Sequence, residues 1–135
     1  MAAFLFTRAI LADKPISVFN HGEMWRDFTY VDDIVSGILA AAAHRPKKTP
    51  PHAVYNLGNH KSEKLTDFIG ILEKALGRKA TYQFEPMQPG DVARTYADID
   101  ASRRDLGFDP KTPIAEGIPR FVAWYKDYYR VWPKN

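Results

Sequence analysis

Apolar side chains recur at helical spacing along several stretches of the chain, and short β-prone runs separate them. Apolar positions 34, 35, 38, 39 and 42 fit one face of a helix, as do positions 65, 68, 69, 72 and 76. Helices are predicted over 2–12, 34–42, 65–76, 101–106 and 113–132, and strands over 16–19, 28–31, 54–57 and 81–84. The range 101–106 is only a short helix, and the pattern as a whole predicts an α+β fold with about four helices and three or four short strands.

Residues that begin and end helices flank these segments. Asp32 or Asp33 is expected to cap the helix over 34–42, because a carboxylate can accept the free N–H groups of a first turn. Ser62 or Thr66 is expected to open the helix over 65–76, and Gly77 to end it in the left-handed conformation that glycine adopts without strain.

The first predicted helix, over 2–12, is apolar around most of its circumference. Helices of this kind are normally buried on several sides. One interpretation is that a partner surface lies outside this chain, so that Met1 is an internal residue of a longer protein. The other is that the helix is central to a small core. If its apolar surface stays uncovered, self-association is expected.

Composition narrows the class of protein. The 135 residues are 45% hydrophobic, enough for one core, so a single domain over 1–135 is predicted. The net charge of +3 is scattered and no basic run exceeds two residues, which argues against a nucleic-acid surface. The absence of cysteine excludes disulfides and a cysteine nucleophile and fits the cytoplasm. The interrupted apolar start predicts neither a signal peptide nor a membrane span.

Motifs for cofactor binding and catalysis are missing from the sequence. None of the eight glycines forms a G-x-G or G-x-x-G turn, and none of the seven tyrosines is followed four positions later by lysine. The four histidines lack metal-ligand spacing. We therefore predict no catalytic, cofactor-binding or metal-ligating residue in this chain.

Two short segments contain chemistry suited to a nucleoside diphosphate. Arg26 lies at the entry of a predicted strand, where a guanidinium can donate two hydrogen bonds to a pyrophosphate; the alternative is a local ion pair with Asp27 or Glu23. Gln88 to Asp91 form a Pro-Gly turn that ends in a carboxylate able to accept two ribose hydroxyls. The alternative for Asp91 is a role in stabilising the turn.

An ordered set of motifs gives these segments a family context. V-F-N-H-G, R-D-F-T-Y-V-D-D-I, Y-N-L-G-N, P-M-Q-P-G-D-V and T-Y-A-D follow one another along nearly the whole chain. The set resembles the C-terminal region of extended short-chain dehydrogenases/reductases of the NAD-dependent epimerase/dehydratase family. M-Q-P-G-D-V followed by T-Y-A-D is most similar to the UDP-glucuronate 4-epimerase branch.

The resemblance implies a UDP-sugar site. Arg26 would bind the diphosphate, Phe19 would pack on the uracil with Val18 beside it, and Asp91 would hold the ribose. Met87 and Gln88 would line the same loop. Galactose epimerases place a second phosphate-binding arginine where this chain has Gln88, which weakens a UDP-galactose assignment and leaves Arg94 as an auxiliary cation.

The resemblance also implies what the intact enzyme does. A Rossmann domain binds NAD there, and UDP-glucuronate and UDP-galacturonate are interconverted. This chain corresponds to the small C-terminal substrate-binding subdomain, with the Rossmann domain absent, and alone it is expected to be inactive. The alternatives are part of another nucleotide-sugar dehydratase or decarboxylase, and a stand-alone binding or assembly module.

Overall fold

The computed structural model describes residues 2–47 and 49–131, and it has the expected α+β architecture. Within these residues there are five α-helices, rather than about four, and four strands of three residues each. In chain order the elements are α1 (Ala2–Leu11), β1 (Ile16–Val18), the 3-10 turn η1 (Phe19–Gly22), β2 (Trp25–Asp27), α2 (Val31–Ala43), β3 (Ser62–Lys64), α3 (Leu65–Leu76), β4 (Tyr82–Phe84), α4 (Asp100–Leu106) and α5 (Ile114–Tyr128).

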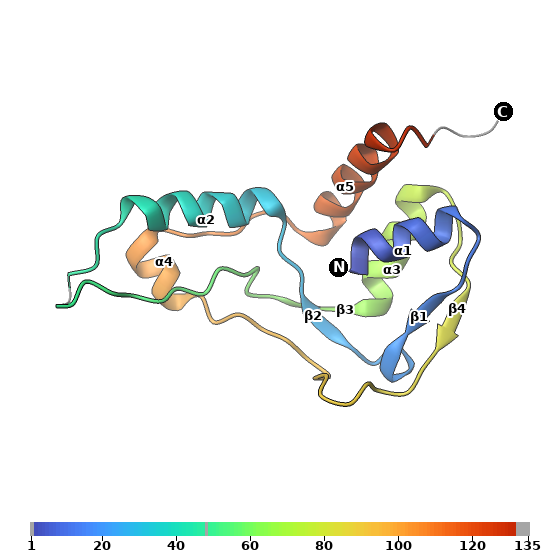
Figure 1. The fold of residues 1–135 in the computed structure, drawn as a ribbon, viewed down its shortest axis with the longest axis horizontal. Helices are drawn as coiled ribbons and strands as arrows, with labels where there is room; N and C mark the ends of the chain where they lie inside the picture. The colour runs from blue at the N-terminus through green and yellow to red at the C-terminus, as the bar shows by residue number, and fades with distance from the viewer. Residues whose placement is uncertain (1, 48, 132–135) are drawn as a thin grey trace.

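The elements form two groups joined by extended segments (Figure 1). Helices α1, α3 and α5 gather at one end, together with the parallel pair β1–β4. Helices α2 and α4 contact each other at the opposite end. The antiparallel pair β2–β3 lies between the two groups. Strand β2 is therefore close to connecting segments from both groups.

The hydrophobic core lies in the first group and is organised by α3. Four apolar residues of this helix are buried, at the spacing that the sequence predicts. They pack with Ile10 of α1, with β1 and with Val122 of α5. Each fully buried side chain of this size stabilises the fold by about 1.5–3 kcal/mol. Gly77 ends the helix at φ 70°, and its N–H bonds to the carbonyl oxygen of Glu73 at 2.9 Å, which confirms the predicted stop.

Two of the four predicted strands are in place, and two are not. Strands β1 and β4 pair in parallel, with Ile16 opposite Tyr82. The run predicted at 28–31 is wrong, because the strand is β2, three residues earlier, and α2 already begins at Val31. The run predicted at 54–57 is wrong, because it forms no strand and pairs with none of the strands of the described residues. Strand β3 carries no strand signal in its sequence, because Ser-Glu-Lys is polar throughout.

The predicted caps of two helices are also wrong. Tyr30 and Lys64 precede α2 and α3, and neither helix has a side-chain cap. Asp33 lies within the first turn of α2 and instead accepts the main-chain N–H groups of Lys111 and Thr112, at 3.2 and 3.0 Å. This carboxylate therefore holds the connection before α5 against α2. Ser62 lies within β3, and Thr66 lies within the first turn of α3.

Uncovered apolar surface lies on α2 more than on α1. In α1, Thr7 and Ile10 are buried, and the ring of Phe4 lies 5.3 Å from that of Tyr125, although Leu5 is half exposed. In α2 a continuous apolar stripe is exposed, with exposed fractions of 45–65%, and consists of Val31, Val35, Ile38 and Leu39. No helix in the described part of the chain is long and apolar enough to span a membrane.

The aromatic end of α5 is only partly buried. Tyr125 belongs to the core, whereas the ring of Trp124 stacks on that of Tyr128 at the surface, with centroids 5.3 Å apart. Part of this aromatic segment therefore packs in the core, and part lies at the surface. Trp132, which the sequence places at the end of the stripe, lies outside the described residues.

Glu73 is a buried carboxylate that should make the free energy of unfolding depend on pH. Burial by itself would raise the pKa of Glu73, but hydrogen bonds from the Ala80 N–H at 2.8 Å and from Lys79 at 2.9 Å outweigh it and lower the pKa below its ordinary value. A carboxylate whose pKa is lower in the folded than in the unfolded state stabilises the fold at any pH above its unfolded-state pKa. This contribution is lost as the pH falls through the folded-state pKa.

We therefore expect the free energy of unfolding to fall as the pH drops below about 4.3, the ordinary value for glutamate. The Glu73→Gln variant should lose less stability than the parent chain between pH 5 and about pH 3, as measured by urea unfolding. Glu116→Gln, on the half-exposed face of α5, is the matched control and should keep the parent's pH dependence. An unchanged slope in Glu73→Gln would contradict this assignment.

Candidate functional site

Strand β2 contacts two other segments of the chain. On one edge it pairs with β3, with Arg26 opposite Glu63. The main chain of Trp25 bonds to the other segment: its N–H donates to the carbonyl oxygen of Ala93 at 2.8 Å, and its carbonyl oxygen accepts the N–H of Thr95 at 3.1 Å. The loop that precedes Ala93 is therefore tethered to the strand that carries Arg26.

This tether brings together Arg26 and Asp91, the two residues predicted to grip the nucleotide. The Nη2 of Arg26 lies 2.8 Å from Oδ1 of Asp91, and its Nη1 donates to the carbonyl oxygen of Trp25 at 2.9 Å. The local pairing considered for Arg26 is wrong, because Glu23 pairs with Lys64 at 2.9 Å. With side chains 23% and 33% exposed, the two charges remain accessible to a polar ligand.

The loop from Gln88 to Asp91 forms the predicted turn. The N–H of Asp91 donates to the carbonyl oxygen of Gln88 at 3.1 Å, and Gly90 has φ 82°, a conformation that favours glycine. The carboxylate of Asp91 also accepts the N–H of Val92 at 2.8 Å. The turn thus fixes the direction of the carboxylate, while Met87 and Gln88 are exposed on the same loop.

The predicted uracil-contacting segment, Val18 and Phe19, connects to this loop through β4. Phe19 is half-buried and begins η1, in which His21 donates its N–H to the carbonyl oxygen of Glu85 at 3.2 Å. Glu85 follows β4 directly and leads into the 86–91 loop. The side chain of Val18 is fully buried in the core, so it can support Phe19 but has no free surface for a ligand.

Asp27 joins three segments beside Arg26, and sequence reasoning assigned it no role beyond a local ion pair. Its carboxylate accepts the main-chain N–H groups of Asn59 at 2.7 Å, His60 at 3.1 Å and Ala97 at 3.0 Å. These partners lie 32 to 70 positions away along the chain, so no local sequence pattern predicts them. A Cβ on Gly58 would lie 2.3 Å from the Ala97 Cβ, so this close approach requires glycine.

Two cations lie over the ring of Trp25. The Nζ of Lys64 is 5.5 Å, and the Cζ of Arg94 is 5.4 Å, from the ring centroid. Both distances are within the range of cation–π attraction. Arg94, the auxiliary cation suggested by the resemblance, is therefore engaged with the neighbour of Arg26, on an exposed part of the same loop.

Comparison with known proteins gives the family. The model of the NAD dependent epimerase/dehydratase family matches residues 1–58. Protein CapI of Staphylococcus aureus is 43% identical over 144 residues, covering 96% of this chain and 43% of that protein. UDP-glucuronate 4-epimerase 2 of Arabidopsis thaliana is 41% identical over 143 residues, covering 96% of this chain and 33% of that enzyme. The chain belongs to the NAD dependent epimerase/dehydratase family.

Solved structures of this family share the fold. The UDP-glucuronic acid 4-epimerase from Bacillus cereus, in complex with UDP-glucuronic acid and NAD, matches with a TM-score of 0.84 and 33% identity. MoeE5 in complex with UDP-glucuronic acid and NAD matches with a TM-score of 0.86 and 26% identity. The chain covers 40% and 42% of these two proteins, and it likewise spans only about two fifths of the first curated relative.

Proposed function

We propose that the chain is the UDP-sugar-binding part of an NAD-dependent UDP-glucuronate 4-epimerase, whose intact form interconverts UDP-glucuronate and UDP-galacturonate. The observation that carries the proposal is the placement of Arg26 and Asp91, 65 positions apart, at 2.8 Å on adjoining segments. The relatives named as UDP-glucuronate 4-epimerases, and the Bacillus cereus complex with UDP-glucuronic acid, support this choice of nucleotide sugar.

Each residue of the site has a defined role in this proposal. Arg26 donates to the diphosphate oxygens with N–H groups that remain available beside its bond to Asp91. Asp91 accepts the ribose hydroxyls with the oxygen that does not bind Arg26. Phe19 packs on the uracil with Val18 behind it, and Met87 and Gln88 complete the loop. In the absence of nucleotide, Arg26 and Asp91 neutralise each other.

The cofactor belongs to a part of the enzyme outside this chain. A dinucleotide needs a glycine-rich turn at a helix N-terminus, and the sequence has none. None of the residues directly before α2, α3, α4 and α5 is glycine; they are Tyr30, Lys64, Ile99 and Pro113. This chain's own residues therefore do not fit NAD, and we assign none of them a part in hydride transfer.

A cofactor-binding part would also cover surfaces that this chain leaves open. The apolar stripe of α2 is exposed, and so is Val54, at 76%, on the unpaired segment 53–57. We propose that a Rossmann domain packs against the stripe and pairs with the segment, and that the chain alone self-associates through this surface. The cytoplasmic location remains a prediction from the cysteine-free composition.

Calorimetry with UDP, UDP-glucuronate and uridine tests the proposal. We expect UDP to bind with a dissociation constant of about 0.1–1 mM, and UDP-glucuronate to bind within about threefold of UDP, because the sugar contacts lie in the missing part. Uridine should bind at least about tenfold more weakly, since it lacks the diphosphate. Equal binding of UDP and uridine would contradict a phosphate role for Arg26. Epimerisation of UDP-glucuronate by the chain with added NAD would contradict its predicted inactivity.

A further inference from the structure

Strand β2 is the middle strand of a three-stranded ribbon. Segment 93–95 lies along one edge of β2, joined to it through the main chain of Trp25, and β3 lies along the other edge. Successive side chains of a strand point to opposite faces, whereas residues directly opposite each other on neighbouring strands share a face. Trp25 and Arg26 therefore lie on different faces of the ribbon, and Arg26 shares its face with Glu63 of β3.

The face of the ribbon that carries Trp25 holds two cations. Lys64 and Arg94 both lie over the ring of Trp25, and Lys64 also binds Glu23 at 2.9 Å. Arg94 is thus on the face opposite Arg26. A second cation for a diphosphate bound at Arg26 has to come from the face that carries Arg26 itself.

Lys61, directly before β3, is a cation on the face of Arg26. It lies two positions before Glu63, and its Nζ is 2.7 Å from Oε1 of Glu63, so the two side chains share a face. The side chain of Glu63 is only 15% exposed, whereas that of Lys61 is 66% exposed. The carboxylate therefore fixes the position of an ammonium group that is open to solvent and has further N–H donors for a ligand.

Glu63 by itself would repel a diphosphate held by Arg26. Opposite residues of an antiparallel pair have Cβ atoms about 4.5–5.5 Å apart, and Glu63 is directly opposite Arg26. A diphosphate at Arg26 therefore lies close to the negative charge of Glu63. The ion pair with Lys61 offsets this repulsion, because it places a positive charge in contact with the same carboxylate.

We propose that Lys61 is the second cation of the UDP-sugar site and binds the distal phosphate, to which the sugar is attached. This inference rests on the function proposed above. Asp91, the proposed ribose acceptor, leads into the segment on one edge of the ribbon, Arg26 is in the middle, and Lys61 is at the other edge. Neighbouring strands lie about 4.8 Å apart, a step similar to the length of a diphosphate group. Glu63 acts as a positioning residue, since it holds the ammonium group at this edge.

NMR titration of the full 135-residue chain with UDP and with UMP tests this inference, because only UDP carries the distal phosphate. Lys61→Gln should weaken UDP about fivefold and leave UMP within about twofold of the parent. Lys61→Arg should bind UDP within about twofold of the parent, because it keeps the positive charge. Unchanged UDP affinity in Lys61→Gln, or an equal loss for UDP and UMP, would overturn the assignment.

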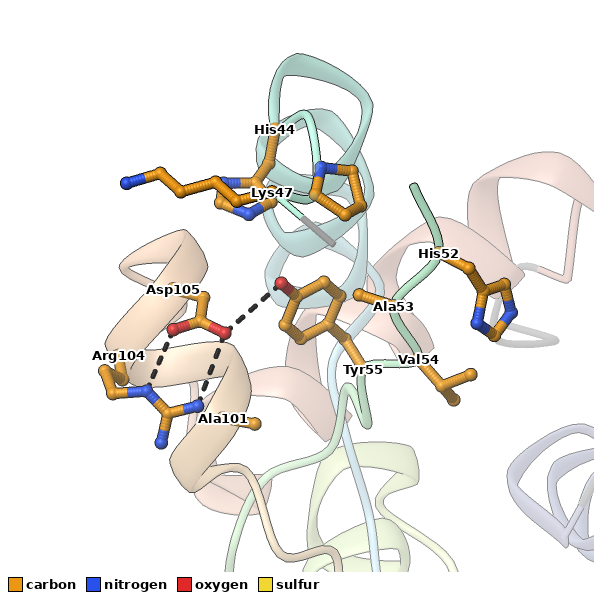
Figure 2. A pocket seen from close by; sticks show the side chains of 10 residues that line it. His44, Lys47, His52, Ala53, Val54, Tyr55, Ala101, Arg104 and Asp105 are labelled. Atoms are coloured by element: carbon orange, nitrogen blue, oxygen red, sulfur yellow. Dashed lines mark hydrogen bonds and ion pairs between the residues drawn. The ribbon is translucent and has the colours of Figure 1, made fainter. Parts of the chain in front are cut away.

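Two matched variants test whether the position of the cation matters. Lys64→Gln removes a cation of β3 on the opposite face of the ribbon and should bind UDP as the parent does. Arg104→Gln should do the same. Arg104 is exposed to a similar extent as Lys61, 69% against 66%, and it binds Asp105 at 2.9 Å on α4, away from β2 (Figure 2). A loss of UDP affinity in either control as large as that in Lys61→Gln would indicate a general effect of charge and would contradict the assignment.

Arg26→Gln distinguishes failure of this inference from failure of the proposed function. Arg26 is next to the proposed ribose acceptor, so its loss should weaken UMP as well as UDP. If Arg26→Gln weakens both ligands and Lys61→Gln weakens neither, the proposed function stands and Lys61 has no part in it. If UDP does not bind the parent chain, the proposed function fails and this inference fails with it.

Discussion

Replacing Arg26 by glutamine is expected to weaken UDP binding about 10- to 100-fold, measured by calorimetry. Arg26 is the one guanidinium on β2, and its side chain is held by Asp91 and by the carbonyl oxygen of Trp25. It therefore loses little conformational freedom when a ligand binds. Hydrogen bonds between charged groups contribute about 1.5–3 kcal/mol each, which sets the size of the loss. Arg103→Gln, on the exposed surface of α4, is the control and should bind UDP as the parent does. An unchanged affinity in Arg26→Gln would contradict the proposed role.

The Asp91→Asn variant tests the other member of the Arg26–Asp91 pair. Asp91→Asn removes the carboxylate that competes with phosphate for Arg26, but it also removes the charged acceptor for the ribose. We therefore expect inorganic pyrophosphate to bind Asp91→Asn more tightly than the parent, and uridine to bind it more weakly. The affinities for pyrophosphate and for uridine should therefore change in opposite directions. A parallel loss of both would indicate that Asp91 acts by stabilising the loop.

Replacing Asp27 by asparagine is expected to lower the free energy of unfolding by about 3 kcal/mol in urea. The carboxylate accepts three main-chain N–H groups, and an amide turned toward the same donors would leave at least one of them unsatisfied. A buried donor without a partner costs about 1–3 kcal/mol. Asp109→Asn, whose carboxylate is 56% exposed and lies 3.6 Å from Lys111, is the control and should change stability by less than about 0.5 kcal/mol.

Hydrogen exchange distinguishes a local from a global effect of Asp27. In Asp27→Asn, the amides of Asn59, His60 and Ala97 should exchange faster than those of α3, because they lose their own acceptor. UDP binding should fall as well, since these segments flank Arg26 on β2. Stability within about 1 kcal/mol of the parent would show that Asp27 does not hold the three segments together.

The sequence predicted those parts of the fold in which one segment carries its own signal. In α3, apolar residues at helical spacing and a terminal glycine suffice, because the helix buries a continuous face and ends in a left-handed turn. The turn before Asp91 is of the same kind, since proline and glycine restrict the backbone locally. Strands of three residues carry no such signal. Their place depends on a neighbour, as the missed β3 and the unpaired segment 54–57 demonstrate.

By itself the sequence determined the α+β class, the main helices and the residue types of the proposed nucleotide site. Only the tertiary structure decided which charges meet. Proximity along the chain suggested that Arg26 pairs with Glu23 or Asp27, whereas the ladder between Trp25 and the 93–95 segment brings in Asp91 and leaves Asp27 to three distant amides. The pattern likewise showed an apolar face on α2, but not that it stays uncovered. A charge is satisfied by whatever donors the fold brings within about 3 Å, and sequence spacing does not fix that distance.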